Sequence, residues 1–216
     1  MVGKAAKSWV KICGMTNVAD AVAAANAGAD AVGFVFVPSS PRAATREEVA
    51  KILPALPPSV VPIGVVANED PDFLRGLLRV CPLHGLQFHG EESPEQVLAF
   101  KGKVRFLIKA IRVKNAGSLE IIPFYQGVDA ILLDTDHPDR TGGTGVSFDW
   151  QLALRAKSFG IPVIVAGGLT PANVAAVIEQ VQPFGVDVSS GVEFSPGRKD
   201  PVLVREFIHK ATSPLS

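Results

Sequence analysis

The stretch from Ile161 to Gly191 reads IPVIVAGGLTPANVAAVIEQVQPFGVDVSSG and contains a complete strand, helix and strand. An apolar run at Pro162–Ala166 precedes two glycines, and a second at Val186–Val188 precedes Ser-Ser-Gly. Between them, Thr170-Pro171 supplies a capping side chain and a proline at the first helical position. Continuous apolar runs are typical of parallel strands that are buried on both faces. The stretch therefore predicts two parallel strands joined by a helix.

The same alternation recurs along the whole chain, with a spacing of about 25 residues. Helix start signals occur at Thr16-Asn17, Thr45-Arg46-Glu47-Glu48, Asp70-Pro71 and Ser93-Pro94. Gly28, Gly102 and Gly160 lie where helices are expected to end. The eight apolar runs are Trp9–Cys13, Ala31–Val37, Val61–Val66, Gly85–Phe88, Val104–Ile111, Ala130–Leu133, Pro162–Ala166 and Val186–Val188.

Eight strands that alternate with about eight helices indicate an α/β fold with a parallel sheet. We predict a single (β/α)₈ TIM barrel over residues 1–216, with residues 1–8 as a flexible N-terminal extension. An open doubly wound sheet is the alternative, but it would concentrate its ligand-binding residues near one switch point. Here the glycine-rich and polar segments follow the strands along the entire chain, which favours the barrel.

The composition excludes several classes of function. The 216 residues are 47% hydrophobic and carry 21 basic and 21 acidic side chains, so the formal net charge is zero. A neutral chain has no electrostatic basis for binding nucleic acid or an anionic membrane. No apolar run is long enough to span a bilayer, and the N-terminus does not resemble a secretory signal. We therefore expect a protein of the cytoplasm, with an organelle as the alternative, and free thiols at Cys13 and Cys81.

Cys13 is the first candidate for a catalytic residue. It ends the first strand, directly before Gly14, and in a barrel the active site lies at the carboxyl ends of the strands. Lys11 points to the same face of the strand and is expected to lower the pKa of the thiol. The alternative is a small buried thiol with a packing role only. For Cys81, before Pro82, we expect either such a structural role or mere exposure to solvent.

Asp134 is the second candidate, because it follows the buried run that ends at Leu133. A carboxylate in that position is costly unless it is solvated or has a function, although it would also suit a turn cap. Beyond it lies the segment Gly142-Gly143-Thr144-Gly145, in which Gly143 and Gly145 can present backbone amides to a ligand.

The last two strand ends predict a phosphate site. Gly167-Gly168 follows the seventh strand and Ser189-Ser190-Gly191 follows the eighth, the two places where barrels often bind phosphate. We expect a short helix beginning near Val192 to contribute amides from its N-terminus. Asp187 is an unusual neighbour for an anion, so we expect it to orient loop amides or substrate hydroxyls.

Two further side chains complete the predicted site. Arg42, after Ser39-Ser40-Pro41, is suited to bidentate binding of a second anionic group such as a carboxylate. His89, after the fourth strand, is expected to form a hydrogen bond in the pocket. The four histidines have no metal-ligand spacing, so we expect no metal site.

Taken together, the strand ends resemble those of phosphoribosylanthranilate isomerase, a barrel enzyme of tryptophan biosynthesis. The matching motifs occur in order from residue 10 to about residue 210, and their combination is specific. They are Lys11-Ile12-Cys13-Gly14, Gly33-Phe34-Val35-Phe36 with Ser40-Pro41-Arg42, Gln87-Phe88-His89-Gly90, Leu133-Asp134-Thr135, Gly142-Gly143-Thr144-Gly145 with Phe148-Asp149-Trp150, Ala166-Gly167-Gly168-Leu169, and Asp187-Val188-Ser189-Ser190-Gly191-Val192-Glu193.

The resemblance implies an Amadori rearrangement of N-(5-phosphoribosyl)anthranilate, with Asp134 as general acid and Cys13 as general base. It implies that Arg42 binds the anthranilate carboxylate, that the last two loops bind the phosphate, and that no cofactor or metal is needed.

Two alternatives remain at this point: another phosphate-binding barrel enzyme, such as a sugar-phosphate epimerase or a thiazole-phosphate synthase, and a catalytically silent barrel that binds a phosphorylated metabolite. A second activity on an imidazole-carboxamide ribonucleotide also stays open, as does the choice between monomer and homodimer.

Overall fold

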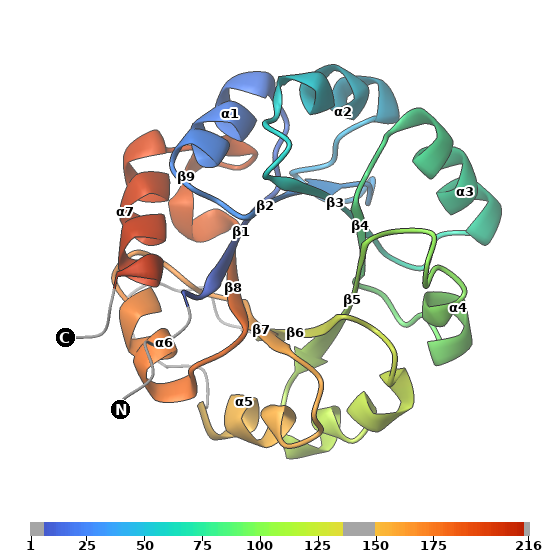
Figure 1. The fold of residues 1–216 in the computed structure, drawn as a ribbon, viewed down its shortest axis with the longest axis vertical. Coiled ribbons are helices and arrows are strands. Elements are labelled where there is room, and N and C mark those ends of the chain that lie inside the picture. The colour runs from blue at the N-terminus through green and yellow to red at the C-terminus, as the bar shows by residue number, and fades with distance from the viewer. Residues whose placement is uncertain (1–6, 136–149, 214–216) are drawn as a thin grey trace.

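A computed structural model describes residues 7–135 and 150–213 of the chain. Eight parallel strands form a closed barrel in sequence order, and helices surround it (Figure 1). The predicted barrel is therefore confirmed. The strands are β1 (Trp9–Cys13), β2 (Ala31–Val35), β3 (Val61–Val66), β4 (Gly85–Phe88), β5 (Phe106–Val113), β6 (Ala130–Thr135), β7 (Val163–Val165) and β8 (Gly185–Val188).

The α-helices follow the strands on the outside of the barrel (Figure 1). Thr45 and Ser93 cap α2 and α4 with capping boxes, as their sequence signals predicted, and prolines begin α3 and α4. The helices are α1 (Val18–Asn26), α2 (Arg46–Ile52), α3 (Pro71–Val80), α4 (Pro94–Leu98), α5 (Trp150–Lys157), α6 (Val174–Val181) and α7 (Pro201–Thr212).

Three local predictions are wrong. The connection from β5 to β6 contains two 3₁₀ segments, η2 (Ala116–Leu119) and η3 (Ile122–Tyr125), instead of an α-helix. The helix α6 begins at Val174 and not at Thr170-Pro171, because the Thr170 amide donates to the Asn173 side chain and closes a turn first. No α-helix begins near Val192. A 3₁₀ turn, η4 (Ser190–Val192), leads instead into a hairpin of β9 (Glu193–Ser195) and β10 (Arg198–Lys199).

The barrel interior is packed in layers along its axis. At the amino-terminal end of the strands, Trp9, Phe106 and Phe184 form an aromatic cluster. Small and branched apolar side chains fill the middle, and Cys13, Val35 and Val65 pack together at the carboxyl end. A second, larger core joins the outer faces of the strands to the helices. The candidate site therefore lies on a solid core and is not the mouth of a channel.

Strand register determines which side chains meet inside the barrel. The β1–β8 pairing that closes the barrel sets Lys11 opposite Asp187, and the β1–β2 pairing sets Cys13 opposite Gly33. A Cβ atom on Gly33 would lie 2.7 Å from Cys13 Sγ and 3.1 Å from Lys11 Cε. Glycine at position 33 therefore makes room for both side chains at the same level of the barrel.

Candidate active site

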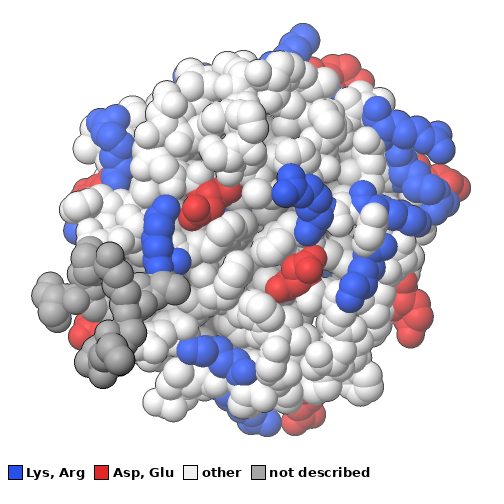
Figure 2. Space-filling model, in the orientation of Figure 1, with Lys and Arg blue, Asp and Glu red and all other residues white. Residues whose placement is uncertain are grey.

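A cavity of about 420 Å³ opens at the carboxyl end of the barrel and contains most of the predicted site. The predicted residues that line it are Cys13, Arg42, His89, Asp134, Gly167, Gly168, Asp187, Ser189, Ser190 and Gly191. Gly143 and Gly145 lie outside the described residues. Val35, Val37 and Val65 add an apolar wall beside Cys13. Side chains of both signs are interspersed on the face shown in Figure 2, so ligand selection depends on individual groups.

Cys13 ends β1 with its side chain directed to the cavity, and only 7% of the residue is exposed. Burial raises the pKa of the thiol above its ordinary value of 9.0; the Lys11 ammonium opposes that shift without reversing it. Lys11 does act to lower the pKa of Cys13, as expected, but the effect of burial is larger and the pKa is raised. Lys11 is itself fully buried and donates to Asp187 Oδ2 at 2.9 Å.

The raised pKa makes a direct prediction for chemical modification. Because only the thiolate reacts with iodoacetamide, the rate of inactivation is expected to rise with pH and to level off only above pH 9.0. The measurement is residual activity against time at a series of pH values. A Cys81→Ser variant serves as the control, because Cys13 is then the only cysteine in the chain. An inflection near neutral pH would contradict the assigned environment.

Asp134 lies near the end of β6 and interacts with His89 from the loop after β4. His89 Nε2 is 3.1 Å from Asp134 Oδ2, and His89 Nδ1 is 3.0 Å from Gln87 Nε2. An amide nitrogen only donates, so Nδ1 accepts and the ring proton is on Nε2, from which it is donated to the carboxylate. The predicted hydrogen bond of His89 is confirmed. The role of Gln87 was missed, because a buried glutamine in a strand has no distinctive sequence signal.

The loops after β7 and β8 are in close contact. A Cβ on Gly191 would lie 1.8 Å from the Leu169 carbonyl oxygen, so only glycine fits there. Gly167 and Gly168 have positive φ angles of 79° and 66°, and their amides donate to no other group in the described part of the chain. The predicted glycines and serines thus meet at one end of the cavity, with free backbone donors for an anion.

Asp187 has a different environment from the one predicted. Its Oδ2 accepts from Lys11, while its Oδ1 is buried without a partner among residues 7–135 and 150–213. Ser189 also has a partner, because its hydroxyl donates to the Cys13 carbonyl oxygen at 3.2 Å. A substrate hydroxyl would complete the hydrogen bonding of Asp187 Oδ1, whereas no loop amide contacts either oxygen in the described chain.

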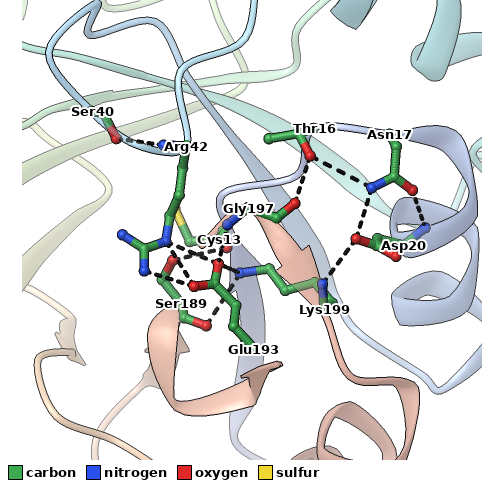
Figure 3. Close-up of polar contacts among 10 residues, drawn as sticks. All are labelled: Cys13, Thr16, Asn17, Asp20, Ser40, Arg42, Ser189, Glu193, Gly197 and Lys199. Atoms are coloured by element: carbon green, nitrogen blue, oxygen red, sulfur yellow. Dashed lines mark hydrogen bonds and ion pairs between the residues drawn. The ribbon is translucent and has the colours of Figure 1, made fainter. Parts of the chain in front are cut away.

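Arg42 reaches the cavity from the loop after β2. Its Nη2 donates to Glu193 Oε2 at 2.6 Å, and Nε lies 2.9 Å from Oε1 (Figure 3). This partner is 151 positions away in the sequence and was not foreseen. Arg112 at the end of β5 also lines the cavity and was missed, because an arginine near a strand end is common on protein surfaces.

Residues 7–135 and 150–213 contain no cluster of three or more His, Cys, Asp or Glu side chains suited to a metal ion. In the same ranges, none of the helices has both the length and the apolar character needed to span a bilayer. Cys81, at the end of α3, is buried and donates from Sγ to the Arg46 carbonyl oxygen at 3.3 Å. It is therefore structural, as predicted.

Comparison with known proteins gives one consistent result. The sequence profile described as N-(5'-phosphoribosyl)anthranilate (PRA) isomerase matches residues 10–210. The protein of that name from Geobacter sulfurreducens is 50% identical over 202 residues, which are 94% of this chain and 97% of the relative. The one from Trichlorobacter lovleyi is 47% identical over 206 residues, which are 95% of this chain and 98% of the relative.

Solved structures agree. The crystal structure of phosphoribosyl anthranilate isomerase from Thermotoga maritima has a TM-score of 0.88 and 42% sequence identity, and the match covers 94% of this chain and 98% of that one. A crystal structure of such an enzyme in complex with reduced 1-(o-carboxyphenylamino)-1-deoxyribulose 5-phosphate has a TM-score of 0.85 and 40% identity, with the same coverage of both chains.

Proposed function

Because the chain belongs to the N-(5'-phosphoribosyl)anthranilate isomerase family, we propose that its cavity carries out the Amadori rearrangement of N-(5'-phosphoribosyl)anthranilate in tryptophan biosynthesis. The product is 1-(2-carboxyphenylamino)-1-deoxyribulose 5-phosphate. The observation that carries the proposal is that the Cys13 thiol, the Asp134 carboxylate, the Arg42 guanidinium and the two loops after β7 and β8 surround the same cavity. Each of these groups corresponds to one feature of the substrate.

The orientation of the substrate follows from the two anionic groups that it carries. Its phosphate binds to the loops at Gly167-Gly168 and Ser189–Gly191, where backbone amides are available. Its carboxylate binds to Arg42, and the aromatic ring lies against the apolar wall of Val35, Val37 and Val65. The ribose is then held between Cys13 and Asp134, the two groups that exchange protons with it.

The first step opens the ribose ring. Asp134 delivers a proton to the ring oxygen while the lone pair of the anthranilate nitrogen forms a double bond to C1, and the C1–O bond breaks. The product of this step is a protonated Schiff base. The resulting Asp134 carboxylate keeps the hydrogen bond from His89 Nε2 at 3.1 Å, which stabilises its new charge. We therefore assign His89 the role of holding Asp134 in place.

The second step removes the proton from C2. The Cys13 thiolate takes that proton, and the electrons of the C–H bond move to the Schiff base, which gives an enolamine. A thiolate with a raised pKa is scarce but strongly basic, and the positive charge of the Schiff base favours its formation. Conversion of the enol to the ketone completes the reaction. One proton passes from Cys13 to Asp134 through solvent to restore the starting state.

Arg42→Ala tests the orientation of the substrate. The substitution removes the carboxylate contact but neither proton-transfer group, so KM is expected to rise by about 10- to 100-fold with a smaller change in kcat. The measurement is initial rates followed by loss of anthranilate fluorescence, with Arg75→Ala on the exposed face of α3 as the control. An unchanged KM would show that the carboxylate binds elsewhere.

Three further assignments belong to the same proposal. The chain acts as one barrel domain; of the N-terminal extension expected at residues 1–8, residues 1–6 lie outside the described residues and Ser8 is buried. It works in the cytoplasm, as suits an enzyme of amino-acid biosynthesis, and it acts as a monomer or a homodimer. A solved relative from Thermotoga maritima, with a TM-score of 0.84 and 38% identity over 94% of this chain and 98% of that one, is described as mutually generated monomers of a dimeric enzyme.

A further inference from the structure

Arg42 is held by one edge of its guanidinium group. Glu193 accepts from Nη2 at 2.6 Å and from Nε at 2.9 and 3.1 Å, in a bidentate arrangement. Nη1 forms no hydrogen bond or ion pair within residues 7–135 and 150–213. The side chain of Glu193 is 4% exposed and that of Arg42 is 17% exposed, so the pair is largely shielded from solvent. By binding Nε and Nη2, Glu193 fixes the plane of the guanidinium and so the direction in which Nη1 donates.

Glu193 is held in turn by Lys199 on the neighbouring strand of the β9–β10 hairpin (Figure 3). Lys199 Nζ donates to Glu193 Oε1 at 2.7 Å and to the Ser189 carbonyl oxygen at 3.2 Å. The Gly197 amide adds a donor to Oε1 at 3.3 Å. The backbone amide of Lys199 donates to Asp20 Oδ2 at 2.9 Å, which joins the hairpin to the first turn of α1. The carboxylate of Glu193 is thus fixed from several sides.

The charges in this group do not cancel. Arg42 and Lys199 contribute two positive charges and Glu193 one negative charge, so one positive charge remains. Lys199 is 2% exposed, and a buried lysine is costly unless it has a paired carboxylate. Since Lys199 already neutralises Glu193, the charge of Arg42 stays available to a second anion. A pair that served stability alone would need only one of the two cations.

The stem of Arg42 is fixed as well. It passes over Gly14, where a Cβ atom would lie 2.7 Å from Arg42 Cδ and 3.0 Å from Ser189 Oγ. Gly14 directly follows Cys13, and Ser189 belongs to the loop after β8. The position of the guanidinium is therefore fixed with respect to Cys13 and to the loop after β8, which we call the phosphate-side loop. Lys199 contacts that same loop through the Ser189 carbonyl oxygen.

We propose that Glu193 and Lys199 are positioning residues that orient Arg42 toward the carboxylate of the substrate. This inference rests on the proposed function, which supplies that carboxylate. Glu193 binds one edge of the guanidinium and leaves the other edge to the substrate, while Lys199 keeps Glu193 in place and links it to the phosphate-side loop. The β9–β10 hairpin is thereby part of the recognition of the anthranilate end of the substrate.

Glu193→Gln tests the proposal through the sign of its effect. The substitution keeps the shape of the side chain and removes one negative charge beside Arg42. By charge alone, an anionic ligand should bind more tightly to this variant. Loss of positioning has the opposite effect, because outer groups that orient a binding residue typically contribute about 10- to 100-fold to affinity. We expect binding of a carboxylated ligand to weaken by about tenfold.

The experiment is calorimetric titration with two unreactive reduced product analogues, one with the 2-carboxyphenylamino group and one with a phenylamino group instead. The expected result is weaker binding of the carboxylated analogue only. Equal weakening of both would reveal a general structural effect and overturn the proposal, as would unchanged or tighter binding of the carboxylated analogue. Glu206→Gln on the exposed face of α7, where Glu206 pairs with Lys210, is the matched control and is expected to change neither affinity.

Glu193→Asp provides a second test that keeps the charge. The shorter side chain draws the carboxylate back from Arg42, so the same selective loss for the carboxylated analogue is expected even if the glutamine variant does not fold. No selective loss in the aspartate variant would overturn the proposal.

If the wild-type protein bound neither analogue, the proposed function itself would fail. If it bound both equally, only the carboxylate contact of Arg42 would fail, and the positioning role with it.

Discussion

Replacement of Cys13 by alanine is expected to lower kcat by about 10²- to 10⁴-fold, the usual contribution of one general base. The thiol lies at the carboxyl end of β1 and lines the cavity, with a glycine opposite that leaves room for it. Without it, no group at this position can take the C2 proton of the Schiff base. Phosphate and carboxylate recognition involve other residues, so the affinity for an unreactive product analogue should change little.

A Cys13→Ser variant separates basicity from packing. Serine nearly preserves the volume of the side chain, but its hydroxyl is far less acidic than a thiol and does not form the base. Both variants should therefore fold, bind the analogue and fail to turn over substrate. Purified protein, circular dichroism and steady-state rates give these three readouts. Turnover close to that of the wild type in either variant would remove Cys13 from the mechanism.

Replacement of Asp134 by asparagine is expected to lower kcat by a similar factor of about 10² to 10⁴, for a different reason. Asparagine retains an oxygen that can accept from His89 Nε2, but it has no proton to deliver to the ring oxygen at ordinary pH. The ring therefore stays closed, and the block precedes the step that needs Cys13. The local packing is conserved, so the free energy of unfolding should change by about 1 kcal/mol or less.

Exchange of the C2 proton with solvent follows the second step directly and does not depend on measuring turnover. When the reaction is run in deuterated water, neither variant should exchange the C2 proton of the substrate, because one lacks the base and the other does not form the Schiff base. Asp72→Asn, at the exposed start of α3, is the control and should behave as the wild type does. Retained turnover in the Asp134 variant would mean that another group opens the ring.

Much of the fold was predictable because buried parallel strands are continuous apolar runs. β1, β3 and β4 have the predicted bounds, and the others differ at their ends by one to a few residues. The errors arise where tertiary contacts decide the local structure. The segment after Ser189 forms a 3₁₀ turn, and within it Gly191 lies so close to the Leu169 carbonyl oxygen that a larger residue would not fit. Gly197, with φ of 76°, then lies in the turn of the β9–β10 hairpin, where a helix was predicted from the sequence.

Site residues could be predicted where they lie at the carboxyl end of a strand, because that end of the barrel forms the cavity. That rule brought Cys13 and Asp134 into one cavity, although they lie more than a hundred residues apart. The hydrogen-bond partners of Arg42 and His89 could not be predicted in the same way, because they depend on contacts that form only in the folded chain. Glu193 binds Arg42 from a hairpin, and Gln87 fixes the ring of His89 from inside a strand. Neither residue type is unusual at its place in the sequence.

The most direct test of the central claim is the fluorescence of freshly prepared N-(5'-phosphoribosyl)anthranilate after addition of the purified wild-type protein. We predict that the anthranilate fluorescence falls as the substrate is converted, and that the double variant Cys13→Ala, Asp134→Asn leaves it at the level of spontaneous decay. A flat trace from well-folded wild-type protein would contradict the account. It would leave a barrel that binds a phosphorylated metabolite without transforming it.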